Sequence, residues 1–196
     1  MPVSRPEGGV TPDGRQYAYT PNDCSGGDVD GDGDYELILK WEPTNAHDNS
    51  HDGYTGNVIL DCYRLDGTQL WRIDLGRNIR AGAHYTQFLV YDFDGDGRAE
   101  LICKTAPGSL DASRRYVSEV ADDEAIRQID NHADHRNKRG RIQSGEELLT
   151  VFNGLTGDAI HTVWYNPNRG YGVGGSAEYA GWGDKTVEGN RGERYL

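Results

Sequence analysis

The chain has 196 residues, of which 35% are hydrophobic, and its 32 Asp and Glu outweigh 20 Lys and Arg to give a formal net charge of −12. Such an acidic chain repels nucleic acid and anionic membrane surfaces, and it has no apolar stretch of about 18 residues that would span a bilayer. We therefore expect neither nucleic acid nor a membrane as a partner. The three cysteines, an odd number without paired spacing, argue against a disulfide framework or a zinc site, and we expect Cys24, Cys62 and Cys103 to be small core residues.

The first predicted element is an acidic loop that runs into a strand. Residues 28–36 read Asp-Val-Asp-Gly-Asp-Gly-Asp-Tyr-Glu, and the apolar residues that follow, up to Trp41, predict a β-strand. Residues 58–73 show two apolar runs around an Asp-Gly pair, which is typical of a hairpin. A further apolar run at residues 85–91 predicts another strand.

A second copy of the acidic loop begins 64 residues after the first. Residues 92–100 read Asp-Phe-Asp-Gly-Asp-Gly-Arg-Ala-Glu, and an apolar run again follows in the same register. The pattern breaks in an insert at residues 107–146, where residues 119–130 predict a short helix and residues 132–141 a polar, basic, exposed loop. Residues 148–163 then repeat the hairpin around a Thr-Gly turn.

Each repeat therefore predicts about four antiparallel strands, and repeated sheets of this size are the blades of a β-propeller. The expected fold is all-β, and residues 1–196 form one partial propeller domain of roughly two to three blades. A propeller needs at least about four blades to close. We accordingly expect the chain to be a piece of a larger protein, or to close by association.

The two acidic loops are the predicted metal sites. Aspartates at positions 1, 3 and 5 converge three carboxylates, while glycines at positions 4 and 6 allow the tight turn, and this oxygen-rich set suits Ca²⁺ better than Mg²⁺. An EF-hand would carry glutamate at position 12, where Leu39 and Cys103 stand. Two solvated acidic turns are the alternative, but the carboxylates would repel one another without a cation. The expected ligands, with position 7 contributing its backbone carbonyl, are Asp28, Asp30, Asp32, Asp34 and Glu36 in one loop and Asp92, Asp94, Asp96, Arg98 and Glu100 in the other.

Several runs together resemble the family 11 polysaccharide lyases, the rhamnogalacturonan lyases. The resemblance is nearly continuous from about residue 8 to the end, apart from the insert at residues 108–131, and the Arg-Ala-Gly-Ala-His-Tyr-Thr-Gln run at residues 80–87 is its most specific part. That part belongs to a resembling run over residues 78–88, and the other resembling runs are residues 22–25, 28–41, 53–56, 91–106, 147–154, 182–184 and 190–191.

The resemblance implies an eight-bladed propeller enzyme of which this chain is an N-terminal set of blades. The implied activity is cleavage of the rhamnose–galacturonate backbone of pectin by calcium-assisted β-elimination, in a parent protein that is extracellular or periplasmic. Its implied partners are the pectic polysaccharide rhamnogalacturonan I and the remaining blades of the parent chain. We expect this piece alone to be inactive, because the catalytic base is assigned to no residue of this chain and is expected in the missing blades.

The resemblance also implies residues that contact the substrate. Asn22 and Glu42 match positions that line a sugar subsite in the family, although the family more often has Asp at the second one. Arg80 is a candidate to pair with a carboxylate, and His84 to contact substrate or metal. Structural roles compete with these: Asn22 as a turn cap, Arg80 in an internal ion pair, His84 as a buried histidine. Trp41 could stack on a sugar ring but more often such a residue is core.

A second function stays open beside the lyase. The same loops and sheets would suit a non-catalytic calcium-binding propeller module for carbohydrate binding or adhesion. The runs at residues 22–25 and 80–87 favour the lyase, since adhesion repeats with similar metal loops lack them.

Overall fold

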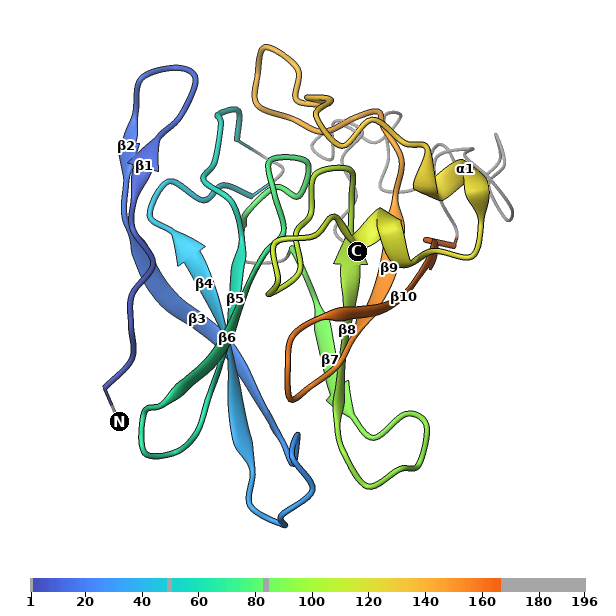
Figure 1. Ribbon diagram of the computed structural model, residues 1–196. Helices are drawn as coiled ribbons and strands as arrows, with labels where there is room; N and C mark the ends of the chain where they lie inside the picture. The colour runs from blue at the N-terminus through green and yellow to red at the C-terminus, as the bar shows by residue number, and fades with distance from the viewer. Residues whose placement is uncertain (1, 49–50, 83–84, 167–196) are drawn as a thin grey trace.

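Two four-stranded antiparallel sheets make up most of the chain (Figure 1). The computed structural model describes residues 2–48, 51–82 and 85–166. The first sheet has the order β3-β4-β5-β6 and the second the order β7-β8-β9-β10, so each is a meander of sequence neighbours. The strands are β3 (Tyr19–Gly27), β4 (Glu36–Pro43), β5 (Ile59–Tyr63), β6 (Gln69–Asp74), β7 (Phe88–Tyr91), β8 (Glu100–Thr105), β9 (Leu148–Phe152) and β10 (Ala159–Trp164), with a small hairpin of β1 (Gly9–Val10) and β2 (Gln16–Tyr17) before them.

The predicted strands and hairpins are confirmed, with one strand shorter than expected. The runs after both acidic loops form β4 and β8, and the two predicted hairpins form β5–β6 and β9–β10. The strand predicted over residues 85–91 begins only at Phe88. Thr86 has a positive φ of 60°, a conformation incompatible with an extended strand, and Tyr85 closes a turn onto the carbonyl of Gly82.

The 64-residue repeat is also a repeat in register. Gly27 pairs with Glu36 at the base of the first acidic loop, and Tyr91 pairs with Glu100 at the base of the second. Both loops project from the same end of their sheets (Figure 1). The sequence periodicity therefore corresponds to two sheets whose first two strands are joined by an equivalent loop.

The main core lies between the two sheets. Ile38, Leu60 and Ile73 of the first sheet are fully buried, as are Leu101 and Phe152 of the second. Burying a side chain of this size contributes about 1.5–3 kcal/mol relative to leaving it exposed. This shared core is what fixes one sheet against the other.

A second apolar cluster covers the other face of the first sheet. Trp41 is 1% exposed there and packs with Leu39 and Ile59 against Tyr17 and Val3 of the N-terminal segment. The indole Nε1 of Trp41 donates to Asp61 at 2.8 Å. Trp41 is thus a core residue and offers no ring face to a sugar.

The outer strands of the second sheet leave apolar side chains in solvent. On β7, Leu89 and Tyr91 are 61% and 68% exposed, and on β10 Ile160 and Val163 are exposed as well. Monomeric proteins seldom leave such side chains together on a sheet edge without a partner.

The segment between β8 and β9 carries little regular structure. The helix predicted over residues 119–130 was wrong in extent: a 3₁₀ turn, η1 (Val117–Val120), precedes a four-residue helix, α1 (Glu124–Arg127). Asp123 divides them because it takes an extended conformation and caps α1, accepting the amide of Ala125 at 2.8 Å. Among the described residues, no helix is long and apolar enough to span a membrane.

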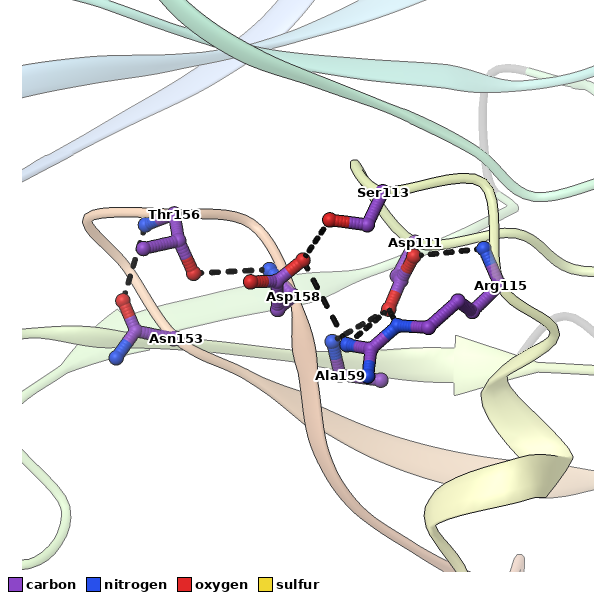
Figure 2. A network of polar contacts seen from close by, with 7 residues as sticks. All are labelled: Asp111, Ser113, Arg115, Asn153, Thr156, Asp158 and Ala159. Carbon is purple, nitrogen blue, oxygen red and sulfur yellow. Dashed lines mark hydrogen bonds and ion pairs between the residues drawn. The ribbon is translucent and has the colours of Figure 1, made fainter.

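One polar network fixes this segment to the turn between β9 and β10 (Figure 2). The carboxylate of Asp111 is 1% exposed and accepts from the guanidinium of Arg115 at 2.9 Å and from the amide of Ala159 at 3.2 Å. The hydroxyl of Ser113 donates to Asp158 at 2.6 Å. The buried charge of Asp111 is therefore paired and hydrogen-bonded, as a buried carboxylate must be.

Two expectations about single residues are corrected. Cys62 and Cys103 are buried, and burial raises the pKa of both thiols to about 12, but Cys24 is exposed on the edge strand β3. The basic stretch at residues 132–141 is only partly exposed. Arg141 is 1% exposed and pairs with Asp52, and the side chain of Arg136 is 11% exposed, pairs with Asp134 and lies over the ring of Tyr54.

Candidate functional site

The acidic loops bring three carboxylates together at one end of each sheet. Ligand oxygens of Asp28, Asp30 and Asp32 lie within 4.8 Å of one another in the loop between β3 and β4. The equivalent residues Asp92, Asp94 and Asp96 meet the same limit in the loop between β7 and β8. The structure thus gathers the side chains at positions 1, 3 and 5 in both copies.

Backbone amides hold the first aspartate of each loop in place. The two carboxylate oxygens of Asp28 accept from the amides of Gly31 at 2.6 Å and Gly33 at 2.9 Å. Both glycines have a positive φ, 82° and 93°, which other residues adopt only with strain. Asp92 is held in the same way by the amides of Gly95 and Gly97, at 2.7 Å and 3.0 Å.

The glutamate at position 9 closes each loop from the strand side. One oxygen of Glu36 accepts the amide of Val29 at 3.1 Å, and one oxygen of Glu100 accepts the amide of Phe93 at 2.9 Å. Glu36 is 4% exposed, and burial, followed by the charges of the nearby aspartates, raises the pKa of its carboxyl. A cation beside these groups would offset that cost.

The two loops touch each other and a neighbouring hairpin. The amide of Ala99 donates to the carbonyl of Asp28 at 2.7 Å. The side chain of Arg98 lies against Gly31, where a Cβ would stand 3.3 Å from its Cγ. From the β5–β6 turn, the guanidinium of Arg64 pairs with Asp30 at 3.0 Å. The side chain of Asp34 at position 7 is exposed, so its expected contribution would come from the backbone.

The predicted sugar-binding residues lie at the opposite end of the first sheet. The side-chain amide of Asn22 on β3 donates to Glu42 on β4 at 3.0 Å. Burial raises the pKa of the Glu42 carboxyl, while the nearby charge of Lys40 opposes the rise. Glu42 follows Glu36 by six residues on the same strand, a separation of about 20 Å at the rise of an extended chain. The acidic loop and the Asn22–Glu42 pair are therefore separate sites.

Arg80 is buried and supports the loop beside that pair. It is 5% exposed, and its guanidinium donates to the backbone carbonyls of His51 at 2.6 Å and Gly53 at 3.4 Å. Burial, and then the charge of Arg80, lowers the pKa of His47 in the same region. His84 lies outside the described residues, as do the resembling runs at residues 182–184 and 190–191.

Sequence reasoning missed two lysines that the sheets place in equivalent positions. The ammonium of Lys40 is 2.5 Å from Asp23 and donates to the carbonyl of Tyr85 at 3.2 Å, although the side chain is 3% exposed. Lys104 pairs with the buried Glu147 at 2.7 Å. The signal was present, because a lysine recurs 64 residues later within otherwise apolar strands. A small hollow beside the first of them, too narrow for a water molecule, is lined by Lys40, Trp41, Glu42, Val58, Ala81, Gly82 and Tyr85.

Comparison with known proteins gives a consistent set of relatives. A family model described as rhamnogalacturonan lyase family 11, C-terminal domain, matches residues 1–196. Rhamnogalacturonan exolyase YesX of Bacillus subtilis is 56% identical over 196 residues, which is 100% of this chain and 29% of that protein. Rhamnogalacturonan endolyase YesW of the same organism is 52% identical over 196 residues, 100% of this chain and 28% of that protein.

Solved structures agree with the sequence relatives. The crystal structure of exotype rhamnogalacturonan lyase YesX superposes with a TM-score of 0.79 at 59% identity and covers 87% of this chain and 26% of its own. The rhamnogalacturonan lyase PL11 of Bacillus licheniformis gives 0.80 at 55% identity, covering 93% and 28%. The chain spans less than a third of the length of these relatives.

Proposed function

The chain belongs to rhamnogalacturonan lyase family 11, and from that premise we propose that it is part of a larger enzyme that cleaves the rhamnose–galacturonate backbone of pectin by β-elimination. The observation that carries the proposal is the match over all 196 residues to one exolyase and one endolyase at more than half identity. Because those relatives act on rhamnogalacturonan by name, the partner we propose for the larger protein is that polymer.

We propose that the two sheets are blades of a β-propeller that further blades complete. Two observations support it: both sheets are four-stranded meanders, and in both the first two strands are joined by the same acidic loop in the same register. The exposed Leu89 and Tyr91 on β7 also call for a covering element. The segment that links β8 to β9, including residues 107–146, would be an insertion within the second blade.

Both acidic loops fit calcium. Each presents an oxygen-only donor set, in which three carboxylates lie within 4.8 Å and a buried glutamate adjoins them. The residues that would hold the ion are Asp28, Asp30, Asp32 and Glu36 with the carbonyl of Asp34, and Asp92, Asp94, Asp96 and Glu100 with the carbonyl of Arg98. When bound, calcium supplies positive charge that neutralises the clustered carboxylates. The first loop lies about 20 Å from Glu42 along β4, and the second repeats its geometry between β7 and β8, so we propose a structural role for both ions.

The proposed reaction removes the C5 proton of galacturonate and breaks the C4–O bond. The electron pair of the C5–H bond forms the C4–C5 double bond, and the rhamnose oxygen leaves and takes up a proton. The carboxylate at C6 must be neutralised for the C5 proton to become acidic. In this chain, Asn22 and Glu42 would bind and orient sugar hydroxyls, and no residue of the chain is assigned as the base.

The larger protein that carries this chain is the proper subject for the test. With calcium present, it should release unsaturated uronate products from rhamnogalacturonan, and these products are detected as a rise in ultraviolet absorbance. We propose that it acts outside the cytoplasm, where that polymer occurs. Asn22→Ala should raise KM more than it lowers kcat, because the residue binds sugar without taking part in proton transfer. If the larger protein binds the polymer with calcium but yields no unsaturated product, the lyase proposal fails and the binding module replaces it.

A further inference from the structure

A basic turn stands out in this acidic chain. Residues 136–141 read Arg-Asn-Lys-Arg-Gly-Arg and hold four positive charges with no acidic residue among them, while the whole chain carries −12. We call residues 136–141 the basic turn. Clustering of like charges costs free energy unless groups of opposite charge offset it, so this turn is suited to binding an anion.

The basic turn is a defined structure. The amide of Gly140 donates to the carbonyl of Asn137 at 2.8 Å, and Arg136 forms an isolated bridge with Ile142. Gly140 has a φ of 72°, and a Cβ there would stand 2.2 Å from the carbonyl oxygen of Gly53. Only glycine therefore lets the turn lie this close to the loop at residues 51–54.

Two of the four cations are used internally. Arg141, 1% exposed, donates to Asp52 at 2.7 Å, and Arg136 pairs with Asp134 at 2.7 Å. The guanidinium of Arg136 also lies 5.2 Å from the ring centre of Tyr54. These contacts stabilise the turn and do not involve its other two cations, Lys138 and Arg139.

Lys138 and Arg139 provide surplus positive charge. Lys138 is exposed, and across residues 2–48, 51–82 and 85–166 no ion pair is formed by it. The side chain of Arg139 is 65% exposed and lies 3.9 Å from Asp52, which already pairs with Arg141 at shorter range. A single carboxylate thus serves two arginines, so the turn presents net positive charge to solvent.

The basic turn lies at the same end of the molecule as the Asn22–Glu42 pair and is linked to it through the loop at residues 51–54 and His47. The amide of Gly53 donates to the carbonyl of Arg139 at 2.8 Å, and the ring of His47 lies against Gly53. His47 follows Glu42 by five residues, and its amide donates to Ala81 beside the hollow at Glu42. Figure 1 shows the connection after β4 and the segment before β9 at the same end of the molecule, opposite the acidic loops.

We propose that Lys138 and Arg139 of the basic turn bind galacturonate carboxylates of the polymer. The bound carboxylates would lie beyond the Asn22–Glu42 pair, toward the loop at residues 51–54. The proposal rests on the proposed function for the identity of the polymer. The polymer carries regularly spaced carboxylates, which would be attracted to the positive charge of the basic turn. The guanidinium of Arg139 and the ammonium of Lys138 both bind a carboxylate well. The turn thereby compensates locally for the acidic character of the rest of the chain, and it extends recognition beyond the sugars at the reacting bond.

Binding of the 196-residue chain to two polymers tests the proposal. The polymers are the rhamnogalacturonan backbone and the same backbone after chemical reduction of its carboxyl groups, which turns galacturonate into uncharged galactose and keeps the linkages. The wild-type chain should bind the native polymer more tightly in affinity electrophoresis or calorimetry. The double variant Lys138→Gln with Arg139→Gln should weaken that binding about four- to 25-fold, because each of the two exposed charge pairs contributes roughly two- to fivefold and the two factors multiply. Binding to the reduced polymer should not change.

A control variant separates local from overall charge. Arg5→Gln with Arg114→Gln removes the same two charges from exposed positions outside the basic turn, and it should leave affinity within about twofold. Equal losses in both double variants, or no preference of the wild-type chain for the native polymer, would overturn the proposal. If the larger protein cleaves rhamnogalacturonan while the Lys138/Arg139 variant binds normally, only this inference fails. If the charge-dependent binding holds but no cleavage occurs, only the lyase proposal fails.

Discussion

The backbone amide of Ala99 donates to the carbonyl of Asp28 at 2.7 Å, and so joins the two acidic loops directly. Asp28 is the first residue of one loop and Ala99 the eighth of the other. The side chain of Arg98 lies against Gly31 across the same contact. The order of one loop therefore depends on the order of its repeat, and the first two predictions follow from this link.

Calcium should stabilise the folded chain through both loops. Ligand binding to the native state raises the free energy of unfolding by about 2.7 kcal/mol per site when the ligand is at 100 times its Kd, and so by about 5.4 kcal/mol for two sites. For a chain of this length that corresponds to a rise in Tm of roughly 10–20 °C. The double variant Asp30→Asn with Asp94→Asn should lose this rise in differential scanning calorimetry. Asp66→Asn with Asp130→Asn, which alters exposed aspartates outside the loops, is the matched control, and an equal loss in the control would contradict the assignment.

The two calcium sites should be coupled through the Asp28–Ala99 contact. Calorimetric titration of the wild-type chain should show two ions bound with positive cooperativity. The Asp94→Asn variant should bind one ion, in the first loop. Its affinity should be about fivefold lower than that of the first loop in the wild-type chain with the second loop occupied, which is at the low end of the usual coupling between sites. Two independent sites in the wild type, each with the affinity measured in a single-loop variant, would refute the coupling.

Asp61 should be a large contributor to stability. It is fully buried, accepts from the Nε1 of Trp41 at 2.8 Å and the hydroxyl of Tyr63 at 2.7 Å, and pairs with Arg72 at 2.7 Å. Asp61→Ala leaves these donors without their acceptor, and removing one partner of a buried pair lowers the free energy of unfolding by about 3 kcal/mol or more. Urea denaturation measures the loss. Asp66→Ala in the exposed β5–β6 turn should cost less than about 1 kcal/mol, and similar losses at both positions would count against the role of Asp61.

Glu42 should make stability depend on pH. Burial raises the pKa of its carboxyl above the ordinary 4.5, and the charges of Asp23 and Asp48 act in the same direction. A carboxyl of this kind stabilises the fold below its ordinary pKa, and this contribution is lost as the pH rises through the raised value. Glu42→Gln carries no charge and can still accept from Asn22. Relative to wild type, the variant should therefore gain stability between pH 4 and pH 7 in urea denaturation.

The exposed Glu119→Gln is the control for that measurement. It should show the same pH dependence as the wild-type chain. A Glu42→Gln variant that loses stability relative to wild type on going from pH 4 to pH 7 would show that the charged form is the one the fold favours.

The thiols should differ sharply in reactivity. Cys24 is exposed on β3, whereas Cys62 and Cys103 are buried with pKa values raised to about 12. Since the thiolate is the reactive form, an alkylating reagent should modify one thiol per native chain at pH 8 and three after unfolding. Mass spectrometry locates the label, and Cys24→Ser should remove the native reaction. Labelling of Cys103 in the native chain would contradict the burial.

The strands and acidic loops could be predicted because their signals are local. Alternating apolar residues, Asp-Gly and Thr-Gly turns, and aspartates at fixed spacing each act within a few residues. The failures have tertiary causes. Cys24 lies beside apolar residues in sequence but on an edge strand in space, and the helix expected around Asp123 is cut short by a cap and by the hydrogen bond from Trp164.

The candidate sugar site was predictable only in part. The Asn22–Glu42 pair came from family resemblance, and the structure places the two side chains 3.0 Å apart. The 64-residue recurrence singled out Lys40, but it did not indicate that Asp23 would be its partner, and nothing in the local sequence indicated that Arg139 would contact Gly53, because these contacts depend on tertiary packing. Such contacts depend on how the sheets and connections pack.

The unequal connections within the two sheets set an order of assembly. The strands of the first sheet are joined by residues 28–35, 44–58 and 64–68, whereas β8 and β9 are joined by residues 106–147. Closing the longest connection costs about 1 kcal/mol more than closing the one between β4 and β5, by the logarithmic dependence of closure entropy on length. The first sheet should therefore gain hydrogen-exchange protection early in refolding, while β9 and β10 acquire it only after the segment before them has docked through Asp111.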